Sequence, residues 1–292
     1  MGRGLVVDRV KGVYDDDIGY DSGRVRGAML AGIVGSLTGL GGGIIITPLL
    51  TLVMGVDMHY AIGAALISVI ATSSGAAAAY VKEGFSNIRI GTVMEIATTT
   101  GAVLGASLAL RAPTKVIAVI FGLVLLYSAA MSLRTHDSEG ASEKPDALAQ
   151  SLELDSTYPA PGGVKAYHVH HVVTGSSVMF GAGILSGLLG IGSGALKVIA
   201  LDEAMRIPFK VSTTTSNFMI GVTAAASVGL YLKHGYIDPG LGIPVMLGSL
   251  AGAFLGARIL PHVKTIALRH AFSVVIAVLA AELIYNGMTG RL

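Results

Sequence analysis

The sequence has 292 residues, of which 52% are hydrophobic and 13% charged, and its mean hydropathy is +0.71. Soluble domains carry about 25% charged residues, so this composition excludes an ordinary soluble protein and indicates one that spans a membrane several times. The sequence contains no cysteine, which excludes disulfides and thiolate metal sites. Its net charge of +2 gives no reason to expect a nucleic-acid partner.

The chain begins with a polar tail, residues 1–26, that contains no apolar run of signal-peptide length. Eight apolar segments long enough to cross a bilayer follow it. They cover residues 26–56, 60–81, 88–110, 114–133, 172–201, 211–232, 240–260 and 265–286. Four lie in residues 27–133 and four in residues 172–289, which predicts an all-α integral membrane protein of two repeats. Residues 134–171 are hydrophilic, and we interpret them as a linker that need not be ordered.

The first apolar segment contains a cluster of glycines, Gly39-Leu40-Gly41-Gly42-Gly43. As one straight helix, residues 26–56 would measure about 45 Å, more than the ~30 Å of a hydrocarbon core. We therefore expect a break at the glycines, with Thr47 and Pro48 in the first turn of the next segment. The excess length favours a re-entrant hairpin, which would make the repeats inverted, whereas a full crossing would make them parallel.

Non-helical backbone at membrane depth must be buried in protein or line a polar cavity. The free amides at the start of the following half-helix would then favour an anion. Gly41, Gly42 and Gly43 are for this reason candidate substrate-binding residues. The alternative is that these glycines only permit close helix packing.

Glu95 lies inside the third apolar segment, about 10 Å along a helix from Ile88. A charged group in hydrocarbon is costly, so it normally faces a cavity, a partner or a substrate path. Glu95 is therefore a candidate residue for coupling transport to protons. Alternatively, its carboxylate balances a positive charge inside the membrane.

The glycine cluster recurs as Gly190-Ile191-Gly192-Ser193-Gly194, and its offset of 151 residues from the first also relates many later positions. The chain is therefore a duplication, with a second broken segment. Gly192, Ser193 and Gly194 are the second set of candidate substrate-binding residues. Lys197, three positions later, is the one basic residue inside an apolar stretch and joins that set as an anion ligand.

Each repeat thus contributes one membrane charge that the other lacks. Lys197 and Glu95 could neutralise one another, or Lys197 could snorkel toward Asp202 and Glu203 near the end of its segment. The competing interpretation is that Lys197 binds an anionic substrate.

The sixth segment begins with a polar run that contains Thr214 and Asn217, which share one helix face. Their side chains can bind the oxygens of a sulfonate or carboxylate, so both are candidate substrate-binding residues. Such side chains also bond to their own helix or to neighbouring helices, and the sequence favours neither role.

Three histidines, His168, His170 and His171, precede the fifth segment. They could hold a metal ion, but without carboxylate or thiol neighbours at ligand spacing a juxtamembrane position is favoured. The sequence contains no recognisable catalytic motif, so we expect neither enzyme activity nor a cofactor.

The chain resembles the TauE/SafE sulfite exporter family of membrane permeases. The resemblance lies in both glycine clusters, in residues 82–89 leading to Glu95-Ile96-Ala97, and in residues 214–217. It covers residues 27–133 and 172–287. It implies a secondary carrier of sulfite, of an organosulfonate such as sulfoacetate, or of a related small anion. One departure is that Ile199 stands in the second repeat where the first has Pro48.

These observations predict a transporter of a small anion that works by alternating access, with a passive anion channel as the alternative. We expect it in the cell membrane with the N-terminus in the cytoplasm, because residues 1–26 contain five Lys and Arg residues. The expected partners are the anion, the lipid bilayer and a coupled proton, and the chain could form a homodimer.

Overall fold

The protein is described by a computed structural model that covers residues 25–33, 42–82, 85–132, 146–160, 163–259 and 265–290. Residues 25–33 are helical. In the first repeat they are followed by α3 (Gly43–Pro48), a π-helical turn η1 (Leu49–Val53), α4 (Met58–Lys82), α5 (Ile88–Ala109) and α6 (Thr114–Ser132). In the second repeat follow α8 (Val172–Leu189), α9 (Gly194–Ile199), the π-turn η2 (Ala200–Ala204), α10 (Phe209–Lys233), α11 (Pro239–Ile259) and α12 (Thr265–Thr289).

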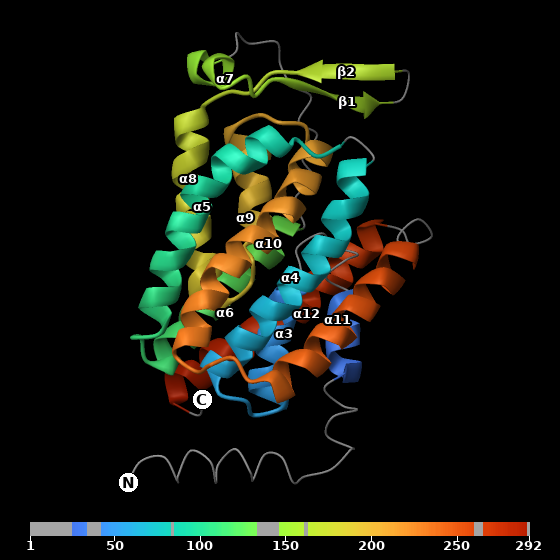
Figure 1. Ribbon diagram of the computed structural model, residues 1–292. Helices are drawn as coiled ribbons and strands as arrows, with labels where there is room; N and C mark the ends of the chain where they lie inside the picture. The colour runs from blue at the N-terminus through green and yellow to red at the C-terminus, as the bar shows by residue number, and fades with distance from the viewer. Residues whose placement is uncertain are drawn as a thin grey trace.

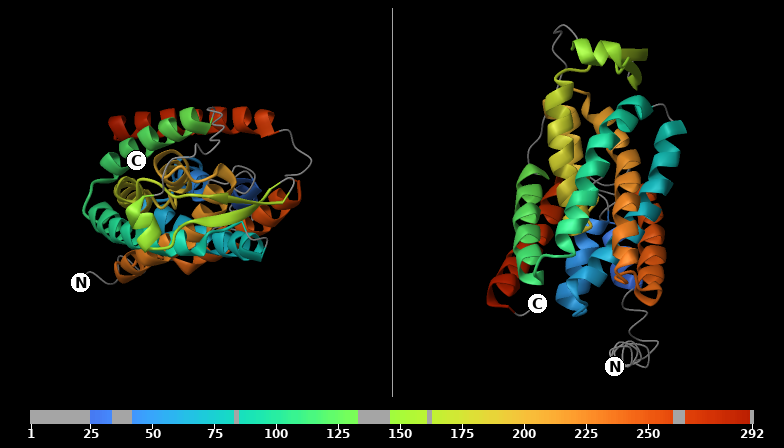
Figure 2. Two further views of the ribbon diagram at one scale, coloured as in Figure 1. Left: turned by 90° about the horizontal axis from the view of Figure 1, so that it is seen from above. Right: turned by 60° about the vertical axis from the view of Figure 1, so that its left-hand side comes forward.

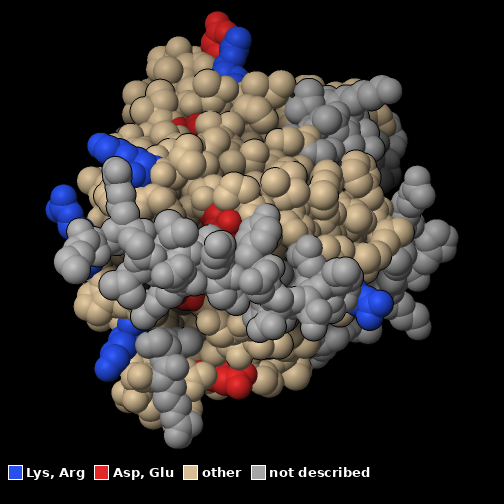
Figure 3. Space-filling view, turned by 60° about the horizontal axis from the view of Figure 1, so that its bottom comes forward, with Lys and Arg blue, Asp and Glu red and all other residues tan. Residues whose placement is uncertain are grey.

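The long helices run roughly side by side through the body of the molecule, with the short α3 and α9 among them (Figures 1 and 2). In the described part, four helices are both long and apolar enough to cross a membrane: α5, α8, α10 and residues 239–256 of α11. Large apolar side chains such as Ile96, Val173 and Val274 point outward, as lipid contact requires. Charged side chains are few and well separated on the face seen from below (Figure 3). This architecture agrees with the predicted all-α membrane class.

The two repeats make the same contacts at the predicted offset of 151 residues. A Cβ atom on Gly101 of α5 would collide with the carbonyl oxygen of Phe180 on α8, and one on Gly252 of α11 would collide with that of Met29. Each repeat therefore packs its third long helix, α5 or α11, against the first helix of the other repeat. The helices approach so closely that only glycine fits at these positions. The duplication seen in the sequence is a structural symmetry.

The repeats are inverted, as the excess length of the first segment predicted. Thr214, near the start of α10, donates a hydrogen bond of 3.0 Å to the carbonyl of Phe85, just after α4. Gly63, near the start of α4, packs in turn against the carbonyl of Tyr236, just after α10. The two corresponding helices therefore run antiparallel, which only an inverted arrangement of the repeats allows.

Both broken segments return toward the side from which they start. In the second repeat, the amide of His170, just before α8, donates to the carbonyl of Met205, just after η2, at 3.1 Å. In the first repeat, Gly27 lies against the side chains of Leu49 and Met54. The predicted re-entrant hairpins are thus present in both repeats, although residues 34–41 of the first break lie outside the described residues.

The half-helix after the first break begins earlier than predicted. Gly42 is the N-cap of α3, and Thr47 and Pro48 lie inside the helix rather than at its start. Both half-helices pass into a π-turn, η1 after Pro48 and η2 after Ile199. Because the second repeat makes this turn without a proline, the departure at Ile199 leaves the geometry unchanged.

The described part of the linker is folded, which the sequence did not predict. It forms α7 (Ala147–Ser151) and a hairpin of the antiparallel strands β1 (Ser156–Ala160) and β2 (Gly163–Tyr167), lying over one end of the helices (Figure 1). The carboxylate of Asp146 accepts from the amides of Leu148 and Val172, which ties α7 to α8. We call residues 146–171 the cap.

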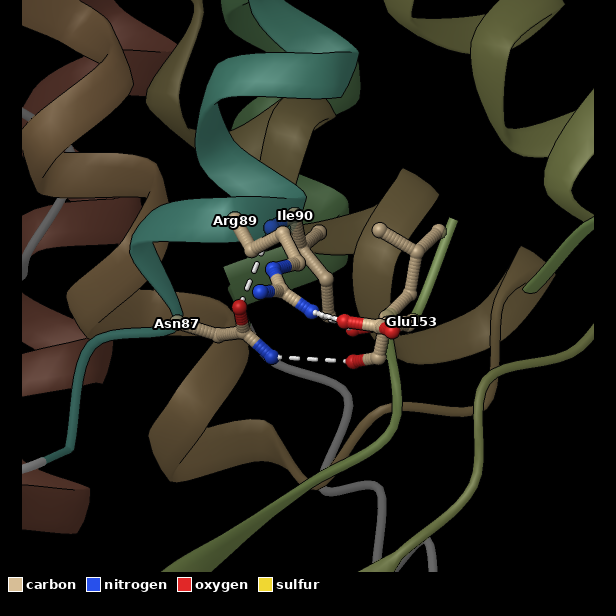
Figure 4. Close-up of polar contacts among 5 residues, drawn as sticks. Asn87, Arg89, Ile90 and Glu153 are labelled. Atoms are coloured by element: carbon tan, nitrogen blue, oxygen red, sulfur yellow. Dashed lines mark hydrogen bonds and ion pairs between the residues drawn. The ribbon is translucent and has the colours of Figure 1, made fainter. Parts of the chain in front are cut away.

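Asn87 fastens the cap to α5 (Figure 4). Its side-chain oxygen accepts from the amide of Ile90 at 3.0 Å and so caps the helix, while its nitrogen donates to the carbonyl of Leu154 and to the hydroxyl of Tyr167. Arg89 adds an exposed ion pair to Glu153 at 2.5 Å. Burial raises the pKa of the Tyr167 phenol, so this hydroxyl stays protonated at neutral pH.

A leucine at Gly183 should destabilise the protein, because a Cβ there would collide with the carbonyl of Thr98 on α5. Forced overpacking costs about 1–3 kcal/mol. Thermal unfolding in detergent should show a clearly lower melting temperature for Gly183→Leu than for the native protein. Gly181→Leu on the same helix is the matched control, because nothing lies within 4 Å of a Cβ at Gly181. Equal melting temperatures for the two variants would contradict this packing.

Asn87→Ala should loosen the cap formed by residues 146–171, because it removes the bonds from Asn87 to Leu154 and Tyr167. It also removes the N-terminal capping bond of α5, which is worth about 1 kcal/mol. Limited proteolysis should cut the cap of this variant faster than that of the native protein. Arg89→Ala is the control, since an exposed ion pair contributes about 0–1 kcal/mol. A cap equally resistant in Asn87→Ala and Arg89→Ala would show that Asn87 does not hold it.

Candidate functional site

The two chain breaks touch at the centre of the molecule. A Cβ atom on Gly43, the first residue of α3, would lie 2.8 Å from the carbonyl oxygen of Gly190 and 2.6 Å from the Val69 side chain of α4. One on Gly192 would lie 3.1 Å from the same Val69. Any larger residue at Gly43 would therefore push the repeats apart where they meet.

The second break has a left-handed backbone at three positions. Gly190 and Gly192 have φ angles of +69° and +70°, which glycine adopts without strain. Ser193, the N-cap of α9, also has a positive φ of 47°, and its buried hydroxyl has no hydrogen-bond partner. The carbonyl of Gly194 accepts a hydrogen bond of 3.2 Å from Ser216 of α10. A strained non-glycine residue at a chain break is typical of a functional position.

Lys197 lies on α9, one turn after this break, and its side chain is 0% exposed. Its amide donates to the carbonyl of Ser193, and its ammonium donates to the hydroxyl of Thr223 on α10 at 2.5 Å. The ammonium thus points into the protein. The interpretation in which Lys197 snorkels toward Asp202 and Glu203 is wrong.

Glu95 of α5 is on the other side of the same hydroxyl. Its Oε1 atom accepts from Thr223 at 2.5 Å and from Thr99 at 3.1 Å. Its Oε2 atom is buried and has no hydrogen-bond partner. The ion pairs recorded for the described residues do not include Glu95 and Lys197. The two opposite charges therefore compensate one another through one threonine, and α5, α9 and α10 meet there.

Sequence reasoning missed Thr223, although it predicted both charged residues. Thr223 is one of several hydroxyl residues along α10, and nothing in its spacing distinguishes it. Its position follows from the packing of α10 against α9, because Ser216, two turns earlier, reaches the backbone of the same half-helix.

Other buried oxygens in the described part also have no hydrogen-bond partner. They include the hydroxyls of Thr47 in α3 and Ser186 in α8, besides Ser193 and Glu95. A buried polar atom without a partner costs about 1–3 kcal/mol, so each of these atoms is available to bond to water or to a bound group. All four belong to the broken segments or to the helix that carries Glu95.

The remaining predicted residues have differing surroundings. Gly42 is buried at the N-cap of α3, against the backbone of residues 31 and 32. Thr214 uses its hydroxyl on the carbonyls of Phe85, Lys210 and Val211, which is a packing role. Asn217 is 8% exposed on the same helix. Gly41 lies outside the described residues. A substrate role for these four residues stays a prediction.

Two of the histidines before α8 make contacts within the protein. His168 contacts the carboxylate of Asp155 at 2.9 Å, and the amide of His170 bonds to Met205. The part of the chain that the structure describes holds no group of three or more possible metal ligands among His, Asp and Glu.

A family model described as "Sulfite exporter TauE/SafE" matches residues 26–283 of the chain. The chain belongs to this family. The match confirms the resemblance found in the sequence, and with it the all-α membrane fold class. The protein is a multi-pass membrane protein of a transporter family.

Curated bacterial relatives have similar lengths. The chain is 28% identical over 268 residues to the probable membrane transporter protein YunE of Bacillus subtilis, which covers 89% of this chain and 96% of the relative. It is 26% identical over 257 residues to the probable membrane transporter protein YdhB of the same organism, and the match covers 88% of this chain and 97% of the relative. A probable membrane transporter protein of Xylella fastidiosa is 28% identical over 228 residues, covering 78% and 80%. No solved structure matches the chain.

Removing one of the two buried charges should destabilise the protein more than removing both. Glu95→Gln or Lys197→Met alone leaves an uncompensated buried charge, which costs about 3–5 kcal/mol, whereas the double variant leaves none. Thermal unfolding of the two single variants and the double variant measures this coupling. Additive losses in the double variant would show that Lys197 and Glu95 do not compensate one another.

Proposed function

We propose that this protein is a secondary transporter that moves a small anion across the cell membrane by alternating access, and that the anion is sulfite or an organosulfonate such as sulfoacetate. The family description supports the substrate class, since it names a sulfite exporter. The relatives named as probable membrane transporter proteins support transport. The proposal includes a cytoplasmic N-terminus, which the five Lys and Arg residues of the tail support.

The observation that carries the proposal is the fully buried ammonium of Lys197, one turn after the second chain break. Burying an ammonium at membrane depth is costly, and an anionic group must offset that cost, as Glu95 does through Thr223 in this structure. A negatively charged solute is the partner that would compensate Lys197 during transport. The unpartnered hydroxyls of Ser193 and Ser186 offer hydrogen bonds to its oxygens.

The inverted repeats supply the means of movement. Two halves of matching geometry can rock against one another about a fixed site between them. The contact of Gly43 with Gly190 brings the two breaks together at such a site, as a carrier of this kind requires.

Purified protein in liposomes loaded with sulfite, with the membrane potential held at zero, should accumulate labelled sulfite above its equilibrium distribution by counterflow, which a carrier catalyses and a passive channel does not. Lys197→Met should reduce this exchange by more than ~10-fold, as expected when a buried charge loses its role in binding. Lys233→Met, an exposed lysine at the end of α10, is the matched control and should exchange normally.

Two outcomes would count against the proposal. Full exchange by Lys197→Met would remove the ammonium from the site. Sulfite flux without any stimulation by sulfite on the opposite side would favour the passive channel instead.

A further inference from the structure

We propose that Glu95, Thr223 and Lys197 form a switch that binds one proton together with one monovalent anion, with the Thr223 hydroxyl as the link between the two sites. This inference rests on the proposed function and adds its coupling ion, its stoichiometry and a residue with a positioning role.

The single hydrogen of the Thr223 hydroxyl makes the link directional. Lys197 donates to the Thr223 oxygen at 2.5 Å, so that hydroxyl must donate elsewhere. Two acceptors are within reach: Glu95 Oε1 at 2.5 Å and the carbonyl of Met219, one turn back on α10, at 2.9 Å. While Glu95 is ionised, its charge attracts the hydrogen. Once Glu95 is neutral, the hydroxyl can turn to Met219.

The charges of the site balance in only two of its four states. With neither ligand, the ammonium and the carboxylate sum to zero. With a proton on Glu95 and a monovalent anion at Lys197, the sum is again zero. A proton alone leaves one positive charge, and an anion alone leaves one negative charge, and each is costly where water is excluded. The proton and the anion therefore favour one another's binding.

The Oε2 atom of Glu95 is the place for the proton, because it is buried and makes no hydrogen bond. Lys197 is the charged group that acts on this carboxyl. The helix α8 carries no titratable side chain. The other titratable groups on the packed elements are Arg89 on α5, Asp202 and Glu203 on η2, and Lys210, Tyr231 and Lys233 on α10. Of these, Lys210 lies over the Phe85 ring and Tyr231 donates to the carbonyl of Gly187, both away from Glu95.

The same balance selects the charge of the substrate. A monovalent oxyanion, such as hydrogensulfite or a simple alkanesulfonate, leaves the loaded site neutral. A dianion such as fully ionised sulfoacetate would leave one negative charge, so within the proposed substrate class the switch favours hydrogensulfite over sulfoacetate. Each transport step is then electroneutral, with one proton moving alongside one anion.

Calorimetric titration in two buffers of different ionisation enthalpy counts the protons taken up when an anion binds. We would titrate the purified protein with sulfite and with methanesulfonate, which does not titrate itself. The native protein should take up about one proton per bound methanesulfonate, and about one more than Glu95→Gln per bound sulfite. Glu95→Gln should bind both anions with no proton from the protein.

Thr223 variants test the link itself. Thr223→Val removes the hydrogen bond that stabilises the ionised carboxyl, so a larger share of Glu95 should hold its proton before the anion arrives, and uptake on binding should fall below one proton. Thr223→Ser keeps the hydroxyl and should restore the native count. A purely structural role for Thr223 would change affinity and leave the proton count unchanged.

The outcomes separate the two proposals. Binding of either anion with equal proton counts for the native protein and Glu95→Gln would overturn the switch and leave the transporter proposal standing. Absence of binding by the folded native protein to both anions would overturn the transporter proposal, and the switch with it. The number of protons that the native protein takes up per bound methanesulfonate tests the switch even if a variant fails to fold.

Discussion

The rest of the structure depends on the hydrogen-bonded chain from Lys197 through Thr223 to Glu95. It places an ammonium and a carboxylate, 0% and 7% exposed, in a protein that spans a membrane. Neither charge is tolerable alone, so α5, α9 and α10 must stay together around one hydroxyl. The break before α9 brings Lys197 to this point, because the second segment turns back on itself after Gly190.

The two repeats share their packing positions but differ in the residues that carry charge. Glycines at equivalent positions, Gly101 and Gly252, let the helices of the two repeats pack closely in inverted copies. Positions equivalent to the charged pair hold Ile46 and Met246. Thr72, equivalent to Thr223, bonds only within its own helix, to the carbonyls of residues 68 and 69. One pseudo-symmetric scaffold therefore holds one charged centre.

Much of this arrangement could be predicted from the sequence, because membranes restrict what a chain can do. The excess length around Gly39–Gly43 predicted the hairpins, and the cost of burying charge identified Lys197 and Glu95. The cap could not be predicted, since its order comes from long-range bonds to Asn87. Thr223 was missed because its role depends on which helix faces it. The predicted place of Thr47 in the first turn was wrong, because the half-helix already begins at Gly43.

Infrared difference spectroscopy tests the central claim most directly, because it detects a protonated carboxyl group by its carbonyl stretch. If an anion replaces Glu95 as the counter-charge of Lys197, adding methanesulfonate to the native protein should produce a protonated-carboxyl band. That band should shift in heavy water and be missing from Glu95→Gln. Bound methanesulfonate without any such band would show that the carboxylate stays ionised beside the anion, and would contradict the account.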